Sequence, residues 1–474
     1  MIDKPREECG VFGIFTNEVT DVTGYAYTAL YALQHRGQES CGIAVNDRGI
    51  INYKRGMGLV NEVFTKENLE QLNGGRIAIG HVRYSTAELY SHHNTLPLVV
   101  KHIKGPMALS YNGSLINAQE LREDCENKGA IFHTVSGAEV IAYAVTEQRL
   151  VCGSIEESLE KAMYKLKGAY SLAIMSPKKL ILARDPAGIR PLCLGVLPGD
   201  AGYVAASESC ALNAIGAQFL RDILPGEIVV ISQDGIRSLT THCGSKSNLC
   251  VLEYIYFARP DSVIEGVSVH EARIRAGEFL AEEHPVEADV VIGAPDSGID
   301  AALGYAKRSG IPYGMGLTRN RYVGRTFIQP TQEMREISVK LKFGAIGSVV
   351  SGKRVVVVDD SMVRGTSTRI IIKMLREAGA REVHIRLSSP PFLNSCFFGM
   401  NIDRSSFLIA DRKTLEEIRK DIDADSLGYL SIENVGRVAA GANCKFCSGC
   451  LSGLYPIAVP DELPKDKFDS RIGQ

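Results

Sequence analysis

The chain has 474 residues, which suggests two or three domains at about 150 residues each. Its 53 lysines and arginines and 55 aspartates and glutamates leave a net charge of -2, so no global field favours a nucleic acid or an anionic membrane as partner. The apolar runs are strand-sized, shorter than the roughly 18 residues of a membrane span, and we expect a cytoplasmic protein without membrane contact.

Near its start the chain places Cys9 between an acidic pair and the apolar run Val11–Phe15. One interpretation is a buried thiol at the start of a core strand. The other requires Cys9 to become the first residue, because a free α-amine with a pKa of about 7.7–8.0 can accept the proton of the thiol. Residues 1–8 lack the apolar stretch of a secretory signal and would then be a propeptide.

Up to about Ile236 the sequence is typical of short strands separated by Gly, Pro and Asn. Helical patterns interrupt the strands at 137–150 and 154–168. Together they predict antiparallel sheets with interleaved helices, an α+β layered domain over residues 9–240.

From residue 250 to 456 the pattern changes to buried apolar runs, each followed by a polar loop and a helix. The clearest unit has a strand at Val355–Val358, a helix that Gly379 ends, and a strand at Val383–Leu387. This is a βαβ crossover and predicts an α/β domain with a parallel sheet, leaving 457–474 as a C-terminal tail. Ligands of such sheets bind beyond the carboxyl ends of the strands, which places a site at 359–368.

The loop at 359–368 combines two kinds of side chain. The adjacent carboxylates of Asp359 and Asp360 are costly to hold together unless a cation or hydroxyl groups meet them, so they indicate a sugar diol or Mg²⁺. The small residues that follow at a helix N-terminus are suited to hold a phosphate. Taken alone, Thr366–Thr368 are also ordinary helix caps.

The chain has 12 cysteines, and without a signal peptide we expect them to be reduced, catalytic or metal-bound. Only Cys444, Cys447 and Cys450 are closely spaced, each three residues from the next. On spacing alone they indicate half of a structural zinc site.

Several motifs resemble known families. VVVVDDSMVRGTST, at 355–368, resembles the phosphoribosyl pyrophosphate signature of type I phosphoribosyltransferases. CGVFGIF, LQHRGQES, GHVRYST and YNGSL resemble class II glutamine amidotransferase domains, whose nucleophile is an N-terminal cysteine. With EYIYFARPDS, YVGRTFIQP and DSLGYLS, their order resembles the glutamine phosphoribosylpyrophosphate amidotransferase family from Cys9 to about Pro456.

The resemblance implies an N-terminal-nucleophile domain followed by a type I phosphoribosyltransferase domain. Together these would convert phosphoribosyl pyrophosphate, glutamine and water to 5-phosphoribosylamine, glutamate and diphosphate, the first step of purine synthesis. It also implies a homo-oligomer, a dimer or tetramer, with purine nucleotides as feedback inhibitors.

By the same resemblance, Cys9 is the nucleophile, and the Asn112 side chain and the Gly113 N–H hold the oxyanion. Glutamine would be bound by Arg83, Tyr84 and Thr86, and the released ammonia would travel inside the protein.

For the second half, the resemblance implies a Mg²⁺ site at Ser297, Asp359 and Asp360. The implied phosphoribosyl pyrophosphate ligands are Arg319, Arg325, Asp359, Asp360, Ser361, Arg364, Gly365, Thr366, Ser367 and Thr368. Arg325 belongs to a segment that resembles a closing loop.

Resemblance to the iron–sulfur members of the family replaces the zinc interpretation by a [4Fe–4S] cluster. Its implied ligands are Cys250, Cys396, Cys447 and Cys450. Cys444 is then either a bystander or an alternative to Cys447.

The sequence departs from the family at a few positions. Gly137 stands where the family usually has an Asp for the substrate ammonium, and YNGS, with Tyr111, replaces HNGN. Glu88 and Glu139 are candidates for the missing charge, and Arg319 replaces a Lys. Two alternatives follow: an ammonia-dependent transferase with an impaired glutaminase, and a regulatory protein that binds phosphoribosyl pyrophosphate. The second is disfavoured because no helix-turn-helix or basic arm flanks the domain.

Overall fold

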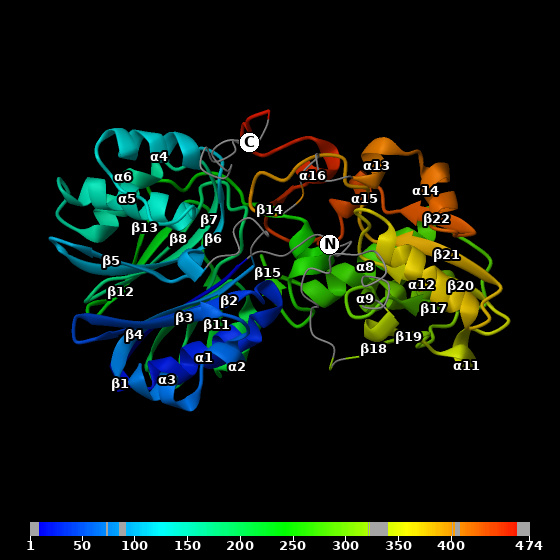
Figure 1. Ribbon diagram of the computed structural model, residues 1–474, viewed down its shortest axis with the longest axis horizontal. Helices are drawn as coiled ribbons and strands as arrows, with labels where there is room; N and C mark the ends of the chain where they lie inside the picture. The colour runs from blue at the N-terminus through cyan, green and yellow to red at the C-terminus, as the bar shows by residue number, and fades with distance from the viewer. Residues whose placement is uncertain are drawn as a thin grey trace, which may run out of the picture.

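The structure is a computed structural model, and it describes residues 9–72, 74–84, 92–320, 322, 340–400, 402 and 408–461. Figure 1 shows two units side by side: paired antiparallel sheets with helices on their outer faces, and a parallel sheet with helices on both faces. The predicted fold class, an α+β layered unit followed by an α/β unit, is confirmed.

The first sheet, sheet A, is antiparallel with the strand order β11-β9-β10-β1-β4-β2-β3. Its strands are β1 (Gly10–Thr20), β2 (Ser40–Asp47), β3 (Ile50–Met57), β4 (Gly75–Arg83), β9 (Cys193–Val196), β10 (Gly202–Ala206) and β11 (Gln218–Asp222). The run Val11–Phe15 lies in the central strand β1, as the sequence predicts.

The second sheet, sheet B, is also antiparallel, with the order β13-β12-β8-β7-β6-β5. Its strands are β5 (Leu98–His102), β6 (Gly105–Leu115), β7 (Gly168–Met175), β8 (Leu180–Arg184), β12 (Ile228–Ser232) and β13 (Gly235–Leu239). Alternate residues of the two sheets, such as Val11 and Ile79 from sheet A and Ala173 and Leu182 from sheet B, form one buried layer between them.

Helices cover the outer faces of both sheets, giving four layers. On sheet A lie α1 (Val22–Ala32), α2 (Val60–Val63), α3 (Lys66–Gln71) and α7 (Ser209–Ala214). On sheet B lie α4 (Ala118–Asn127), α5 (Gly137–Arg149) and α6 (Ile155–Met163). The short 3₁₀ turns are η1 (Gln34–Arg36), η3 (His92–Asn94) and η4 (Pro198–Asp200). The helix predicted at 154–168 ends five residues earlier than expected, at Met163, because β7 already begins at Gly168.

The parallel sheet has the order β17-β20-β21-β22. Its strands are β17 (Val290–Gly293), β20 (Arg354–Asp359), β21 (Glu382–Leu387) and β22 (Ser426–Tyr429). One face packs against α8 (Val269–Glu283) and α9 (Ile299–Ser309), and the other against α12 (Thr366–Glu377) and α14 (Leu415–Asp421). The predicted βαβ unit is therefore β20-α12-β21.

The remaining elements lie outside these three sheets. They are β14 (Asn248–Cys250) with β23 (Lys445–Cys447), β15 (Val263–Ile264) with β16 (Val267–Ser268), β18 (Leu317–Arg319) with β19 (Phe343–Ala345), η5 (Glu253–Phe257), α11 (Gly347–Val350), α13 (Ile409–Arg412), α15 (Ile432–Val435) and α16 (Gly449–Ser452). In Figure 1, β14 and β15 lie between the two units. Among the described residues, we find no helix that combines the length and the apolar character needed to cross a membrane.

Candidate functional site

Cys9 lies directly before β1, at one end of the layer between the two antiparallel sheets. Its carbonyl oxygen accepts a hydrogen bond from Nε of Arg36 at 3.3 Å. Arg83, the last residue of the neighbouring strand β4, is buried and donates to the carbonyl oxygen of Asn94. Burial lowers the pKa of Arg83, while the nearby Cys9 and Glu39 raise it in part. The predicted nucleophile and the predicted carboxylate-binding arginine therefore lie at the same strand ends.

Asn112 and Gly113 lie on β6, in the facing sheet. The Asn112 side chain is fully buried, and neither of its amide atoms has a hydrogen-bond partner among the described residues. Leaving such a group unpaired costs about 1–3 kcal/mol, so it is retained at a stability cost and is suited to meet a ligand. Gly113 has φ 131°, and a Cβ there would overlap the Ala169 carbonyl oxygen, so the position requires glycine.

His81 links the two sheets at this point. It lies on β4, and its Nε2 is 2.8 Å from the carbonyl oxygen of Tyr111 on β6. Burial, with a smaller contribution from Arg83, lowers the pKa of His81 to about 3, so the ring is neutral and Nε2–H donates to the carbonyl. The bond fixes the strand beside Asn112. Sequence reasoning did not assign His81 a role, although it continues the inward-facing alternation of Ile77 and Ile79.

Of the two remaining predicted glutamine ligands, only Tyr84 lies among the described residues. Tyr84 directly follows β4 and is half-buried. Thr86 and Glu88 lie outside the described residues, as do residues 1–8.

Gly137 begins α5 and lies against Tyr111 of β6. A Cβ at Gly137 would be 3.2 Å from Cε1 and 3.4 Å from the hydroxyl of Tyr111. Glu139 is buried and accepts hydrogen bonds from the N–H groups of His133 and Thr134 and from the Thr134 hydroxyl. This carboxylate is therefore engaged by its own loop, which argues against Glu139 as the replacement charge.

In the parallel sheet, the candidate site forms where β17 and β20 end. The hydroxyl of Ser297, in the loop after β17, donates to Oδ2 of Asp360, and the Ser361 hydroxyl donates to Oδ1 at 2.6 Å. Oδ1 of Asp359 accepts from the backbone N–H of Asp360 at 2.9 Å. Both aspartates are buried. The structure thus brings the predicted Mg²⁺ residues together, and this set of oxygen donors fits Mg²⁺.

The predicted phosphate cradle is the start of α12. Gly365 is the N-cap residue, with φ 79°, and a glycine has no side chain that could cap the helix. The interpretation of Thr366–Thr368 as capping residues is therefore wrong, because the helix already begins at Thr366. Ser367 and Thr368 lie in its first turn, and the preceding Arg364 is half-buried. A helix start of this kind presents N–H groups to an anion.

Arg319 is also brought to this edge of the sheet. It ends β18 and forms an ion pair with Asp296, which lies in the same loop as Ser297. Its Nε is buried without a hydrogen-bond partner among the described residues. Arg325 lies outside the described residues.

The four cysteines predicted to bind a cluster come from three segments that meet beside the parallel sheet. Cys250 and Cys447 are directly paired in the β14–β23 ladder, and Leu393 and Asn394, just before Cys396, donate to the Cys450 carbonyl oxygen at 3.1 and 3.0 Å. The cysteines, all buried, are Cys250, Cys396, Cys447 and Cys450.

Burial raises the pKa of the Cys447 thiol to about 12, with Cys396 adding to the shift and the Gly449 N–H opposing it. Burial and the neighbouring cysteines likewise raise the pKa of Cys250 and Cys450 well above the usual range. Among the described residues, no group of three or more His, Cys, Asp or Glu side chains already stands in a metal-binding arrangement. The four buried thiols nevertheless raise one another's pKa, which makes them neighbours whose charged forms would need a cation, and four cysteines are the usual ligands of an iron–sulfur cluster.

Cys444 is placed apart from this group. Burial raises the pKa of its thiol to about 12, and its charged neighbours are Glu265, Arg184 and Asp222 rather than the other cysteines. This placement argues against Cys444 as a substitute for Cys447.

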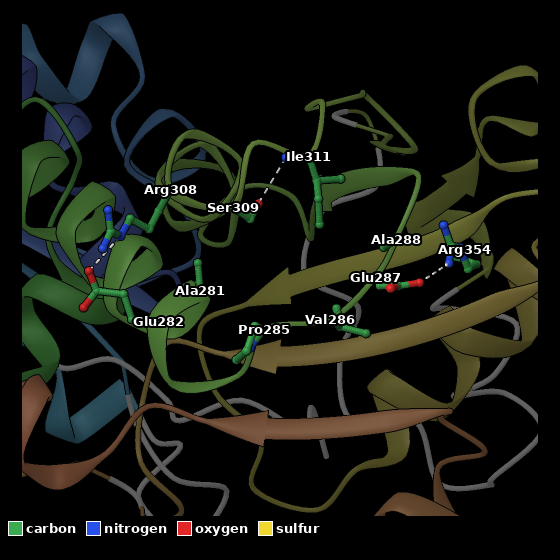
Figure 2. Close-up of a pocket in the computed structure, with 10 residues that line it drawn as sticks. All are labelled: Ala281, Glu282, Pro285, Val286, Glu287, Ala288, Arg308, Ser309, Ile311 and Arg354. Carbon is green, nitrogen blue, oxygen red and sulfur yellow. Dashed lines mark hydrogen bonds and ion pairs between the residues drawn. The ribbon is translucent and has the colours of Figure 1, made fainter.

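A cavity of about 480 Å³ lies at the opposite, amino-terminal edge of the parallel sheet, and Figure 2 shows the residues that line it. Its charged groups are paired, Arg308 with Glu282 at 2.8 Å and Arg354 with Glu287 at 3.3 Å. It lies before β17 and β20 begin, so it is separate from the site at their carboxyl ends.

Comparison with known proteins identifies relatives of both units of the chain. Residues 81–214 match a family described as a glutamine amidotransferase domain. The amidophosphoribosyltransferase of Bacillus subtilis is 46% identical over 459 residues, 96% of this chain and 95% of that protein. That of Archaeoglobus fulgidus is 46% identical over 96% of this chain and 99% of its own. The structure of B. subtilis glutamine phosphoribosylpyrophosphate amidotransferase complexed with ADP and GMP has a TM-score of 0.89 at 44% identity, covering 96% of this chain and 99% of that one.

Proposed function

The chain belongs to the amidophosphoribosyltransferase family, and from this premise we propose how its own residues carry out the two half-reactions. The overall reaction converts phosphoribosyl pyrophosphate, glutamine and water to 5-phosphoribosylamine, glutamate and diphosphate. The observation that carries the proposal is that a chain related to these enzymes over nearly its whole length also keeps an unpaired, buried Asn112 amide in the sheet facing Cys9.

In the first half-reaction, Cys9 is the N-terminal nucleophile once residues 1–8 are removed, and its α-amine takes the proton of the thiol. The thiolate attacks the side-chain amide of glutamine. The Asn112 amide and the Gly113 N–H hold the oxyanion, and ammonia leaves with the proton that the α-amine took from the thiol. Water then hydrolyses the Cys9 thioester, which releases glutamate and restores the thiol. Arg83, Tyr84 and Thr86 hold the amino-acid end of the substrate, with Arg83 facing its carboxylate.

In the second half-reaction, Arg364 and the start of α12 through Thr368 hold the 5-phosphate, while Arg319 and Arg325 face the diphosphate. Ser297, Asp359 and Asp360 would hold a Mg²⁺ ion, which shields the diphosphate charge and makes it a better leaving group. Ammonia then reaches C1 of the ribose without entering water, where it would be protonated.

We further propose that Cys250, Cys396, Cys447 and Cys450 hold a [4Fe–4S] cluster that joins the chain segments carrying them. The proposal includes a glutaminase domain at 9–240, a transferase domain at 250–456 and a tail at 457–474. It also includes purine nucleotides as inhibitors, supported by the ADP and GMP in the B. subtilis structure, and a homo-oligomer. A cytoplasmic location suits the free thiols, which persist in reducing compartments.

The proposal is tested by measuring 5-phosphoribosylamine and glutamate formation with glutamine and with ammonium as alternative nitrogen donors. We expect turnover with both donors. Turnover with ammonium alone would contradict the glutaminase half, which is the concern that Gly137 raises. Absence of turnover with either donor, despite binding of phosphoribosyl pyrophosphate, would contradict the enzyme assignment.

A further inference from the structure

A buried ion-pair network joins the nucleophile of the first unit to the second unit. Arg36 in η1 donates from Nη1 and Nη2 to both carboxylate oxygens of Glu253 in η5, at 2.9 and 2.8 Å. Its third nitrogen, Nε, donates to the carbonyl oxygen of Cys9. The Arg36 guanidinium is therefore in contact with both the predicted nucleophile and a residue 217 positions further along the chain.

The network continues past Glu253. Arg190 donates to Oε1 of Glu253 at 3.4 Å and, through Nη2, to the carbonyl oxygen of Phe398 at 2.9 Å. Glu253 follows Cys250 by three residues, and Phe398 follows Cys396 by two. The path from Cys9 thus ends on two of the segments that carry the proposed cluster ligands.

A second carboxylate, Glu208, completes the charge balance. It accepts from Nη1 of Arg36 at 2.6 Å, from the Ser262 hydroxyl at 2.7 Å and from the Arg259 N–H at 2.9 Å. The two cations Arg36 and Arg190 are then balanced by the two anions Glu208 and Glu253. Each of these side chains is at most 1% exposed. His35, 2.7 Å from Glu208, is the partly exposed member.

Burial of this kind is costly unless every charge is paired with good geometry. Apolar side chains could hold the two units together equally well. Ion pairs, in contrast, also fix the direction of the groups they join, so their presence indicates that the orientation of these groups matters. The planar fork of Arg36 supplies it, because bidentate binding to Glu253 leaves Nε aimed in one direction.

We propose that Glu253 is a positioning residue for the glutaminase reaction: through Arg36 it holds the Cys9 main chain, so that the second unit sets the orientation of the nucleophile. This inference rests on the proposed role of Cys9. Glu253 touches no reacting atom, and its effect reaches the reaction only through the orientation of the thiol and amine of Cys9.

The test is a charge-balanced double variant, Glu253→Gln with Arg190→Met, which removes one anion and one cation and leaves Arg36 paired with Glu208. Small misplacements of reacting groups cost up to about 100-fold in rate. We expect alkylation of Cys9 by 6-diazo-5-oxo-L-norleucine and kcat with glutamine to fall by roughly 10- to 100-fold. KM for glutamine and the rate with ammonium are expected to stay within twofold.

The matched control is Glu227→Gln with Arg221→Met, which removes an ion pair of 2.7 Å between β11 and the start of β12. We expect this control to keep both rates. An unchanged alkylation rate in the Glu253 variant would overturn the proposal, and so would an equal loss with both nitrogen donors, which indicates general structural damage.

If the double variant does not fold, Arg36→Lys decides the matter, because it keeps the positive charge and loses the fork. Wild-type alkylation in Arg36→Lys would overturn the inference. The variant Cys9→Ala shows whether a negative result contradicts this inference alone or the proposed function as well. If Cys9→Ala kept glutamine-dependent turnover, the proposed function would be wrong. If Cys9→Ala lost it while the Glu253 variant kept it, only this inference would be wrong.

Discussion

The two candidate sites are built in opposite ways. The phosphoribosyl site comes mostly from one continuous loop after β20, and its Asp360 carboxylate accepts hydrogen bonds from two nearby hydroxyls. The glutamine site comes from strand ends in two facing sheets, and its key amide, on Asn112, has no described partner. The first site therefore depends on local sequence, whereas the second depends on the packing of distant segments.

This difference predicts two classes of variant. Changes in the phosphoribosyl site should reduce turnover with either nitrogen donor, because both donors attack the same ribose carbon. Changes in the glutamine site should reduce turnover with glutamine alone.

The largest effect is expected for Cys9→Ala. Without the thiol no covalent intermediate forms, and losing such a nucleophile typically costs about 10⁶-fold in kcat. Glutamine-dependent turnover is expected to disappear, while turnover with ammonium stays within twofold, as measured by steady-state kinetics with each donor.

The role of Cys9 as nucleophile requires that Cys9 is the first residue of the mature chain. Intact-mass measurement of the active protein is expected to show a chain that begins at Cys9. A fully active chain that still carries residues 1–8 would contradict the role of the α-amine.

The next largest effect is expected for Asn112→Ala. Removing one oxyanion donor typically lowers kcat by about 10²–10³-fold, or 2.7–4 kcal/mol. Because the buried amide is unpaired, its removal leaves no new unsatisfied group, and we expect the free energy of unfolding to be unchanged or higher. Asn117→Ala is the control, since the Asn117 side chain bonds to the Lys165 carbonyl oxygen at 3.0 Å and has a structural role. A loss of stability without a loss of kcat would refute the assignment.

Asp360→Asn tests the other site. A hydrogen bond to a charged group is worth about 1.5–3 kcal/mol, so we expect turnover to fall by roughly 10- to 100-fold with glutamine and with ammonium alike. Titration with Mg²⁺ is expected to show weaker activation. A loss confined to glutamine would contradict the division between the two sites.

Cys447→Ser and Cys444→Ser test whether the cysteine group supports both units. The wild type is expected to be brown, with about four irons per chain, and Cys447→Ser to lose them. Since structural metal centres contribute folding free energy, its thermal midpoint is expected to fall by more than about 5 °C. Cys444→Ser is expected to keep iron and stability. Colourless protein with stoichiometric zinc would disprove the iron–sulfur assignment.

The smallest effect is expected at Gly137. An Asp there would provide a partner for the substrate ammonium, but its Cβ lies 3.2 Å from the Tyr111 ring, which must shift by a few tenths of an ångström. We therefore expect Gly137→Asp alone to change kcat/KM for glutamine by less than about tenfold. Gly137→Asp with Tyr111→His is expected to give a larger gain. A loss in the double variant would show that Tyr111 itself contributes to glutamine binding.

The sequence predicted the phosphoribosyl site more completely than the glutamine site. The loop at 359–368 and the βαβ unit are contiguous, so their residue pattern indicates both the fold and the ligand, and the structure places Ser297 with them. The capping interpretation of Thr366–Thr368 failed because Gly365 ends the loop one residue earlier.

His81, Glu208 and Glu253 could not be assigned from sequence. Their roles depend on partners that are far away in the chain, such as the Tyr111 carbonyl and the Arg36 guanidinium. Arg36 lies within LQHRGQES, a motif that the sequence identified, yet its contact with Cys9 needs the fold. A buried charge is visible only after the neighbours that bury it are known.

The β14–β23 ladder has a consequence for synthesis on the ribosome. It pairs Cys250 with Cys447, and every strand of the parallel sheet lies between these two residues in sequence. The layered unit is complete long before Cys447 leaves the exit tunnel and can fold during translation, as N-terminal domains generally do. The cysteine group forms only when nearly the whole chain has emerged. A product that ends before residue 445 would thus carry a folded first unit but lack β23, and with it Cys447 and Cys450.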